Sequence, residues 1–208
     1  MKKYLVIGNP IEHSLSPKLH NYWIKLNNIH AIYEKEKLDN NSLETLVSRV
    51  RKKEISGVNI TVPFKRDIIK YIDNLSTEAE VTQSVNTIHL ENDKIVGSNT
   101  DIAGFELAIK HINVSLKDKK ILIIGAGGVV PSIIFALKKM NVSSITISNR
   151  TKEKAENLKF FFKDLIVVNW GEVHDFDAII NATSLGLNNN DELKLNFLDN
   201  IEGKFFYD

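Results

Sequence analysis

The sequence contains no cysteine, and that absence removes several kinds of chemistry at once. Without a thiol the chain forms no disulfide, offers no thiolate metal ligand and has no cysteine nucleophile. The formal net charge is only +1, which leaves no electrostatic footprint for nucleic acid or an anionic membrane. The six histidines show neither His-x-His nor His-Glu-x-x-His spacing, so we expect no metal site.

Long apolar runs are also missing. No stretch approaches the ~20 apolar residues of a membrane span, and residues 4–7 are too short a run for a signal peptide. The hydrophobic content of 43% and the charged content of 25% are those of an ordinary globular protein. We therefore expect a cytoplasmic protein that binds neither nucleic acid nor membrane, with monomer and homodimer both left open.

Strand and helix patterns alternate along the chain. Alternating or continuous β-branched runs predict strands, and apolar positions at helical spacing predict helices. Strands are expected at residues 4–7, 31–36, 58–62, 85–90, 94–97, 120–124, 144–148, 166–169 and 178–182. Helices are expected at residues 16–26, 42–53, 63–72, 77–83 and 102–112, and then up to 140 and up to 162. This alternation implies α/β architecture with a mainly parallel sheet covered on both faces.

Residues 59–65, Asn-Ile-Thr-Val-Pro-Phe-Lys, form a predicted strand that ends at a proline. Pro63 stops the strand and fits the first position of a helix. That helix would place Lys65 and Arg66 in its first turn, where the helix dipole disfavours positive charge. A cation that breaks a local rule at a strand-to-helix corner indicates a functional lysine.

A glycine-rich turn follows the buried strand at 120–124. It consists of Gly125, Ala126, Gly127, Gly128 and Val129, and a helix comes next. Glycines at such a corner allow a tight turn and the close approach of a pyrophosphate to the helix N-terminus. The alternative is a purely structural strand-to-helix turn. The third position of the fingerprint is Val130 rather than glycine or alanine, so we expect a slightly wider helix-to-strand spacing.

The end of the next strand distinguishes the two nicotinamide cofactors. NAD sites place a carboxylate there for the ribose 2′-hydroxyl, whereas NADP sites place cations for the 2′-phosphate. This chain has Asn149, Arg150, Thr151 and Lys152 at that point, and no acid. The guanidinium of Arg150 suits a phosphate, so the pattern favours NADP. The alternative is that Arg150 is a surface charge; Thr151 is expected to cap the following helix.

Further motifs lie at residues 8–17, 84–87, 99–101 and 181–186. With 59–65, 125–128 and 149–151, they make the whole chain resemble the shikimate dehydrogenase family. The resemblance implies reversible, NADP-linked reduction of the 3-keto group of 3-dehydroshikimate to shikimate. It also implies two α/β domains. Residues 1–101 would form a substrate-binding catalytic domain with a mixed, mostly parallel sheet, and residues 102–208 a Rossmann-type NADP-binding domain.

The resemblance also implies roles for individual residues. Ser14 and Ser16 would bind the substrate carboxylate. Thr61, Lys65, Asn86 and Asp101 would surround the ring hydroxyls, with Lys65 and Asp101 as the catalytic pair. The cofactor would contact Gly125, Ala126, Gly127, Gly128, Val129, Asn149, Arg150, Thr151, Lys152, Thr183 and Ser184.

Structural roles compete with several of these assignments. Ser16, followed by Pro17, fits a helix N-cap, and Asp101 fits a cap for the helix that begins near residue 102. Thr61 fits an ordinary strand position and Asn86 a turn. Ser14 has no evident structural role in the sequence.

Members of this family continue beyond Asp208, so we expect a nucleotide domain that is incomplete at its C-terminus. Two other functions stay open. One is a dehydrogenase for quinate or a related hydroxy acid, because one extra ring hydroxyl is hard to judge without pocket geometry. The other is a non-catalytic protein or fragment that binds NADP or another ligand.

Overall fold

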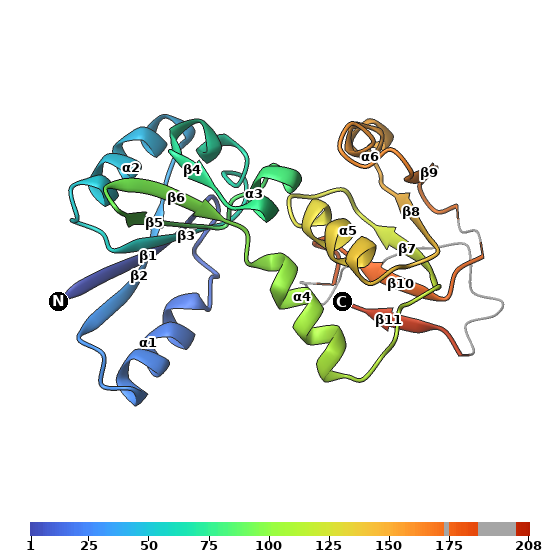
Figure 1. The fold of residues 1–208 in the computed structure, drawn as a ribbon, viewed down its shortest axis with the longest axis horizontal. Helices are drawn as coiled ribbons and strands as arrows, with labels where there is room; N and C mark the ends of the chain where they lie inside the picture. The colour runs from blue at the N-terminus through green and yellow to red at the C-terminus, as the bar shows by residue number, and fades with distance from the viewer. Residues whose placement is uncertain (173–174, 187–202) are drawn as a thin grey trace. The chain divides into compact units, whose positions relative to one another are not determined.

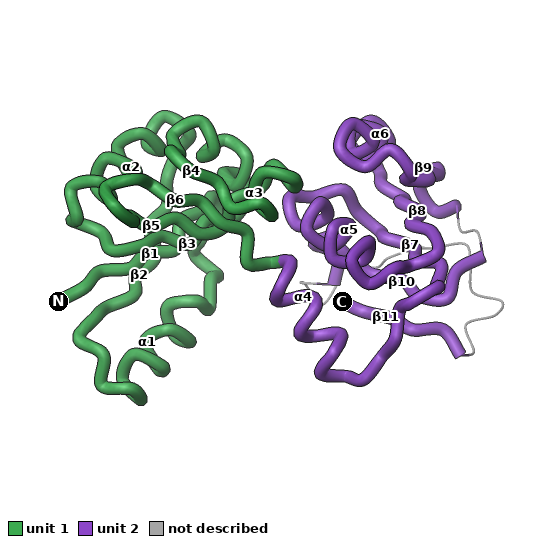
Figure 2. The backbone as a smooth tube through the Cα atoms, viewed as in Figure 1, with its two compact units in different colours: residues 1–101 green, residues 102–208 purple. Residues whose placement is uncertain are grey.

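The computed structural model describes residues 1–172, 175–186 and 203–208. The chain forms two compact units, Met1–Asp101 and Ile102–Asp208, shown in green and purple in Figure 2. Each unit is built on one β-sheet with helices packed against it (Figure 1). The predicted α/β class with two sheets is confirmed. His174, one of the six histidines of the sequence, lies outside the described residues.

The sheet of the first unit is mixed. Its strand order is β2-β1-β3-β5-β6-β4. β1 pairs in parallel with β2 and β3, β5 is antiparallel to both β3 and β6, and β4 is parallel to β6. The strands are β1 (Lys2–Gly8), β2 (Ala31–Lys37), β3 (Gly57–Ile60), β4 (Asn74–Leu75), β5 (Thr87–Glu91) and β6 (Lys94–Ser98). The expected hairpin at residues 85–97 is therefore present, between β5 and β6.

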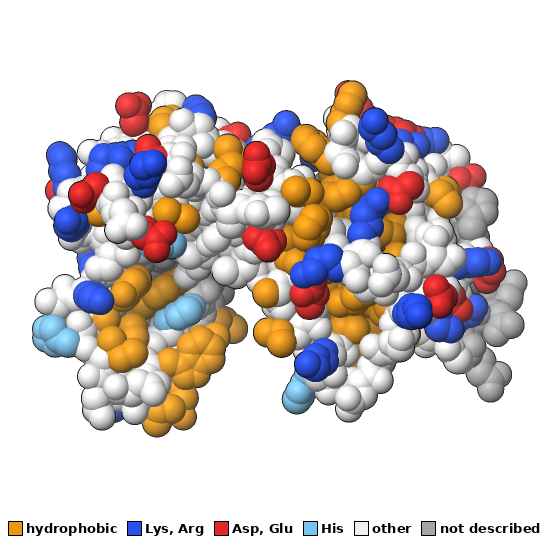
Figure 3. Space-filling model, in the orientation of Figure 1, with side chains coloured by type: hydrophobic (Ala, Val, Ile, Leu, Met, Phe, Trp, Pro, Cys, Tyr) orange, Lys and Arg blue, Asp and Glu red, His pale blue; other side chains and the backbone are white. Residues whose placement is uncertain are grey.

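The helices of the first unit differ in how far they are buried. They are α1 (Ser16–Leu26), η1 (Asn40–Ser42), α2 (Leu43–Arg51), η2 (Asp67–Tyr71) and α3 (Thr77–Thr82). The apolar residues of α2 pack into a core with Leu5, Ile7 and Phe64. α1, in contrast, has no buried residue. Apolar side chains gather on it at the lower left of Figure 3, among them Leu19, Tyr22, Trp23 and Leu26.

The prediction of a helix that opens at Pro63 is wrong. The Val62–Pro63 bond is cis, and the amide of Phe64 donates to the carbonyl of Thr61 at 3.0 Å, which closes a turn. The carbonyl of Lys65 accepts from the amide of Val85 at 2.8 Å, in the segment that leads into β5. The amide of Asn9 likewise occupies the carbonyl of Val62 at 3.0 Å, so neither carbonyl bonds to an amide of the following turn, and only the short η2 follows. Lys65 thus lies in a turn, and the helix-dipole argument does not apply to it.

The second unit has a fully parallel sheet of order β11-β10-β7-β8-β9, as the alternating pattern predicts. The strands are β7 (Lys120–Ile124), β8 (Ser144–Ser148), β9 (Ile166–Val168), β10 (Ala178–Asn181) and β11 (Phe205–Tyr207). The helices are α4 (Asp101–His111), α5 (Val130–Lys139) and α6 (Lys152–Leu158). Val130 is fully buried in the core of this unit, with Ile123 and Ile147. None of the helices in the described ranges is long and apolar enough to cross a membrane.

Candidate active site

Six predicted substrate residues lie at one edge of the first unit's sheet. Because β1 and β3 are adjacent and parallel, the loops that follow them, with Ser14, Ser16, Thr61 and Lys65, leave the same edge. β5 runs antiparallel to β3, so Asn86, just before β5, lies at this edge as well. β6 ends there in turn, and Asp101 follows it. The topology therefore gathers residues that are up to 87 positions apart in the chain, from 14 to 101.

Lys65 and Asp101 form an ion pair in this group. The Nζ atom of Lys65 lies 2.6 Å from Oδ2 of Asp101, and the two side chains are only 14% and 24% exposed. An ion pair that is largely removed from water is weak evidence for stability, because desolvation offsets the attraction between the charges. The pair does, however, fix the position of the Lys65 cation at the sheet edge where the loops after β1 and β3 begin.

The side chain of Asn86 holds the other oxygen of Asp101. Its Nδ2 atom donates to Oδ1 of Asp101 at 2.8 Å and to Oγ1 of Thr100 at 2.9 Å. Asn86 is 8% exposed, so these bonds form in a largely buried environment. Both carboxylate oxygens of Asp101 thus have a donor. The amide of Asp101 donates to Oδ1 of Asn99 at 3.1 Å, so Asn99 serves the start of α4 and Asp101 is not its cap.

Ser14 and Ser16 differ from their expected local roles. The amide of Ser16 donates to Oγ of Ser14 at 3.4 Å, so Ser14 does have a structural role at the start of α1. Ser16 is the first residue of α1, and no side-chain cap bond forms there. The capping alternative for Ser16 is therefore wrong. Both serines are half-buried.

Ionic contacts to β2 anchor the loop that carries Ser14. Nζ of Lys37 lies 3.1 Å from Oε1 of Glu12, and Nζ of Lys35 donates to the Glu12 carbonyl. Oε2 of Glu12 accepts from the amide of Ile11 at 2.9 Å. The backbone amide of Glu12 itself, followed by Lys37, lowers the pKa of the Glu12 carboxyl to about 2, so the anchor stays charged at neutral pH.

Thr61 lies at the end of β3 beside the end of β1. Its amide donates to the carbonyl of Ile7 at 3.0 Å. A Cβ atom on Gly8 would lie 2.6 Å from Cγ2 of Thr61, so the glycine is needed for this close approach. Among the described residues, no hydrogen bond joins Ser14, Ser16 or the Thr61 side chain to the Lys65–Asp101–Asn86 group.

The glycine-rich turn of the second unit uses its glycines for different reasons. Gly125 has φ of +110°, and a Cβ atom there would lie 2.7 Å from the carbonyl oxygen of Ala182. A Cβ atom on Gly127 would approach only that oxygen, at 3.9 Å, and one on Gly128 would meet nothing within 4 Å. Folding of the chain therefore requires Gly125, while the space over Gly127 and Gly128 is open to a ligand.

Replacing Gly125 with alanine is expected to destabilise the second unit by roughly 2–4 kcal/mol, since positive φ and backbone overlap add. Urea unfolding followed by the fluorescence of Trp170, in a Trp23→Phe background, measures this change. Gly128→Ala is the matched control and should leave the unfolding midpoint nearly unchanged. Equal midpoints for both variants would contradict the distinction between the two glycines.

The other predicted cofactor residues follow the carboxyl ends of β8 and β10, which flank β7 in parallel. Arg150 is exposed. Asn149 Nδ2 donates to the Thr151 carbonyl at 2.7 Å, and Lys152 Nζ donates to Oδ1 of Asn169 at 2.9 Å. Thr151 occupies the N-cap position of α6 without a side-chain cap bond, so its predicted capping bond is absent.

Thr183 follows β10 next to the glycine turn. Its Cγ2 atom would lie 3.1 Å from a Cβ atom on Gly125. Its hydroxyl donates to Oδ1 of Asn181 at 2.7 Å and accepts from the amide of Leu185 at 3.0 Å, which shapes this loop. The neighbouring Ser184 is exposed.

Several polar residues near Asp101 had no individual role in the sequence-based prediction. They are Tyr33, Asn59, Thr87, Asn99 and Thr100. Four of them belong to the motif segments at 59–65, 84–87 and 99–101, so their positions next to predicted site residues could have indicated a role. Tyr33 had no such signal, because its contact with Asn59 spans 26 residues.

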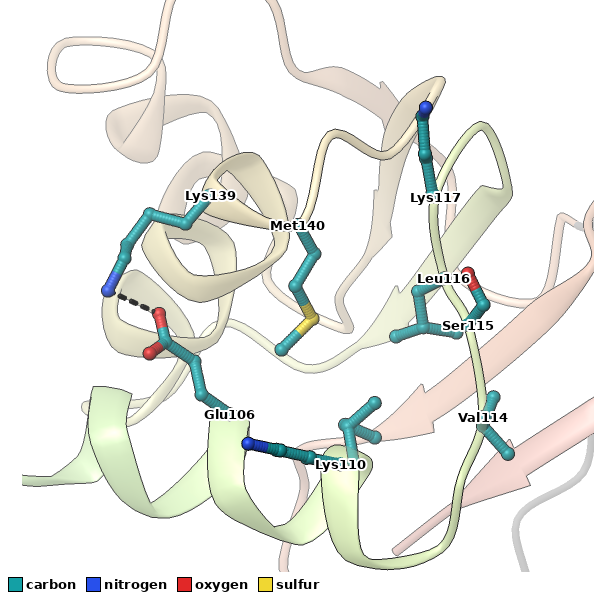
Figure 4. Close-up of a pocket in the computed structure, with 9 residues that line it drawn as sticks. Glu106, Lys110, Val114, Ser115, Leu116, Lys117, Lys139 and Met140 are labelled. Carbon is teal, nitrogen blue, oxygen red and sulfur yellow. Dashed lines mark ion pairs between the residues drawn. The ribbon is translucent and has the colours of Figure 1, made fainter.

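A cavity of about 480 Å³ also lies in the second unit (Figure 4). It is bounded by α4, the end of α5 and the loop at residues 114–117, with Met140 at its wall. Glu106 and Lys139 pair across one side at 2.6 Å. None of the predicted site residues lines it, so it is separate from the glycine-rich turn and from the Lys65–Asp101 pair.

Comparisons with known proteins agree with the motif analysis. A family described as shikimate dehydrogenase substrate binding domain matches residues 6–88, and one described as shikimate / quinate 5-dehydrogenase matches residues 106–188. The NADP(+) shikimate dehydrogenase of Pelagibacter ubique is 56% identical over 207 residues, which are 100% of this chain and 78% of that protein. That of Caldicellulosiruptor saccharolyticus is 40% identical over 90% of this chain and 70% of the relative.

Solved structures give the same result. Shikimate dehydrogenase from Aquifex aeolicus is 37% identical and superposes with a TM-score of 0.85, covering 92% of this chain and 72% of that chain. Shikimate 5-dehydrogenase from Thermus thermophilus, in complex with NADP(H) and shikimate, is 32% identical with a TM-score of 0.81, covering 90% and 70%. This chain belongs to the shikimate dehydrogenase family.

Proposed function

We propose that this protein catalyses the reversible NADPH-dependent reduction of 3-dehydroshikimate to shikimate. The observation that carries the proposal is the Lys65–Asp101 pair, held at 2.6 Å and braced by Asn86. A lysine fixed beside a carboxylate suits this reaction, because charge develops on the oxygen of a ketone while it is reduced. Family membership supplies the substrate class.

The chemistry divides between the cofactor and the chain. Bound NADPH supplies a hydride to the keto carbon, and a proton must reach the keto oxygen. In our proposal the Lys65 ammonium lies next to that oxygen, stabilises its negative charge and belongs, with Asp101, to the pair that supplies the proton. Asp101 also holds Lys65 in position. In the reverse direction the same pair takes the proton from the shikimate hydroxyl.

The remaining polar residues at this sheet edge are proposed to bind the substrate. The hydroxyls of Ser14 and Ser16 bind the carboxylate, and Thr61 and Asn86 bind ring hydroxyls together with the catalytic pair. A polyhydroxylated acid needs several such partners, because each polar group that loses water must find a new hydrogen bond. Residues 1–101 are accordingly the proposed substrate-binding catalytic domain.

Residues 102–208 are the proposed NADP-binding domain. The space over Gly127 and Gly128 fits the close approach of a pyrophosphate, with Ala126 and Val129 in the same turn. Arg150, flanked by Asn149, Thr151 and Lys152, fits the 2′-phosphate, since none of these four residues, which directly follow β8, is acidic. Thr183 and Ser184 complete the site from the neighbouring loop. We also propose that the enzyme is cytoplasmic and either monomeric or homodimeric; the near-zero net charge fits the absence of nucleic-acid partners.

Absorbance of NADPH, followed while the purified protein oxidises shikimate with NADP, tests this function. We expect turnover with shikimate and much less with quinate. The quinate arm is needed because the family matched at residues 106–188 carries both substrate names. Turnover with quinate alone would reject shikimate as the substrate. Tight NADPH binding with no turnover on either acid would instead identify a non-catalytic binding protein.

A further inference from the structure

The orientation of the Asn86 amide is determined by a backbone group. Its Oδ1 atom accepts from the amide of Thr100 at 3.0 Å. A backbone N–H only donates, so the atom facing it must be the oxygen, and the amide nitrogen must face Asp101. The Asn86–Asp101 bond therefore depends on groups that keep this oxygen where it is.

Thr87 is the second residue on that oxygen, beside Thr100, whose hydroxyl lies 3.2 Å from it as well. The Thr87 hydroxyl lies 3.0 Å from Oδ1 of Asn86 and 3.1 Å from Nδ2 of Asn59. Because Oδ1 only accepts, the Thr87 hydroxyl must donate to it and accept from Asn59. The Thr87 hydroxyl thus connects the two side chains with a fixed direction of donation, from Asn59 to Thr87 and from Thr87 to Asn86.

The Thr87 hydroxyl in turn determines the orientation of the Asn59 amide. With its nitrogen toward Thr87, its Oδ1 atom faces the hydroxyl of Tyr33 at 2.6 Å, and Tyr33 must be the donor. Tyr33 is 5% exposed, and burial raises the pKa of its phenol to about 12, so the hydroxyl keeps its proton near neutral pH. Tyr33 lies on β2 and Asn59 on β3, so this bond crosses over β1.

Tyr33 is itself held from two directions. Its backbone amide donates to Oδ1 of Asn21 at 3.0 Å, and its carbonyl accepts from Nδ2 of the same side chain at 2.7 Å. Its ring stacks on His20, with centroids 4.2 Å apart and planes 9° from parallel. The line of hydrogen bonds therefore starts at Tyr33, whose backbone and ring are held by residues of α1.

We propose that Tyr33, Asn59 and Thr87 are positioning residues that act through Asn86 on the Lys65–Asp101 pair. Each bond in the line has only one possible direction. The line ends on the carboxylate oxygen that Lys65 does not use. Linked hydrogen bonds in a largely buried setting reinforce one another, so losing one link loosens the next. The inference rests on the proposed function, because its consequence is a slower catalytic step.

Thr87→Val and Thr87→Ser form the decisive pair of variants. Valine has nearly the shape of threonine but no hydroxyl, and it suits the start of β5, whereas serine keeps the hydroxyl. We expect Thr87→Val to lower kcat for shikimate about tenfold, with KM for NADP unchanged, because a misplaced catalytic group costs rate. Thr87→Ser should restore kcat to within about twofold to threefold. Thr146→Val, at a half-buried position of β8, is the matched control and should retain wild-type kcat.

A double-variant comparison separates positioning from general destabilisation. Tyr33→Phe removes one hydroxyl at the far end of the line and should lower kcat about threefold. Because both changes break the same line, Tyr33→Phe combined with Thr87→Val should be little slower than Thr87→Val alone. If Tyr33→Phe does not fold, the two Thr87 variants decide the question.

The outcomes distinguish the two proposals. No shikimate turnover by the wild-type protein would reject the proposed function. Normal wild-type turnover with equal kcat for Thr87→Val would reject the positioning role and leave the function intact. The same rejection follows if Thr87→Ser is as slow as Thr87→Val, since the hydroxyl would then not be the group that matters.

Discussion

Replacing Lys65 with alanine is expected to lower kcat for shikimate oxidation by about a thousandfold, while NADP affinity stays nearly unchanged. Removing a positioned proton donor typically costs about 10²–10⁴ in rate, and the loss of a charge that stabilises the alkoxide adds to it. The cofactor residues proposed here all lie beyond residue 124, whereas Lys65 belongs to the first unit, so cofactor binding should not respond. Steady-state kinetics and a fluorescence titration with NADPH measure the two quantities.

The matched control for this prediction is Lys52→Ala. Lys52 is an exposed lysine of the same unit, at the end of α2, and its loss should change kcat less than twofold. Loss of NADPH binding in Lys65→Ala would show that the division of roles between the two units is wrong. Full activity in Lys65→Ala would remove Lys65 from the catalytic pair.

Replacing Arg150 with alanine is expected to weaken NADP binding about tenfold to a hundredfold and to leave NAD binding unchanged. A hydrogen bond to a charged group contributes about 1.5–3 kcal/mol, and a guanidinium can form two such bonds with a phosphate. Arg150 is exposed after β8, so its removal should not disturb the sheet. Titrations of both cofactors against the same variant give the ratio directly.

Lys154→Ala controls for the general loss of positive charge near the site, because Lys154 is an exposed residue of the neighbouring α6. It should weaken NADP binding less than threefold, an effect that added salt reduces further. An equal loss of NADP and NAD affinity in Arg150→Ala would mean that Arg150 does not read the 2′-phosphate.

Local sequence was a good guide wherever local bonds decide the structure. β7 and β10 are buried on both faces and appear as continuous apolar runs, whereas β8 alternates isoleucine with serine and threonine; all three strands were expected within one residue of their observed bounds. The glycine-rich turn at residues 125–129 could be predicted from sequence in the same way. Gly125 has a positive φ that other residues adopt with strain.

The helix predicted after Pro63 failed because a distant residue supplies a bond. The carbonyl of Lys65 pairs with Val85, so the helix expected after Pro63 does not form. The failed cap at Ser16 is a local case: the side-chain hydrogen bond at the start of α1 is accepted by Ser14, two residues earlier. Helix propensity depends on a residue and its neighbours in the chain. It therefore does not include a hydrogen-bond partner 20 positions away, as between residues 65 and 85.

Motifs and hydrophobic periodicity are local properties, so the family, the α/β class and the residue types available for binding and catalysis follow from the order of the amino acids. Which polar groups meet depends instead on tertiary contacts. The strand order β2-β1-β3-β5 brings Tyr33, Asn59 and Thr87 into one line that ends on Asp101. Sheet pairing joins strands that are far apart in the chain, and it thereby sets which side chains lie within hydrogen-bond distance.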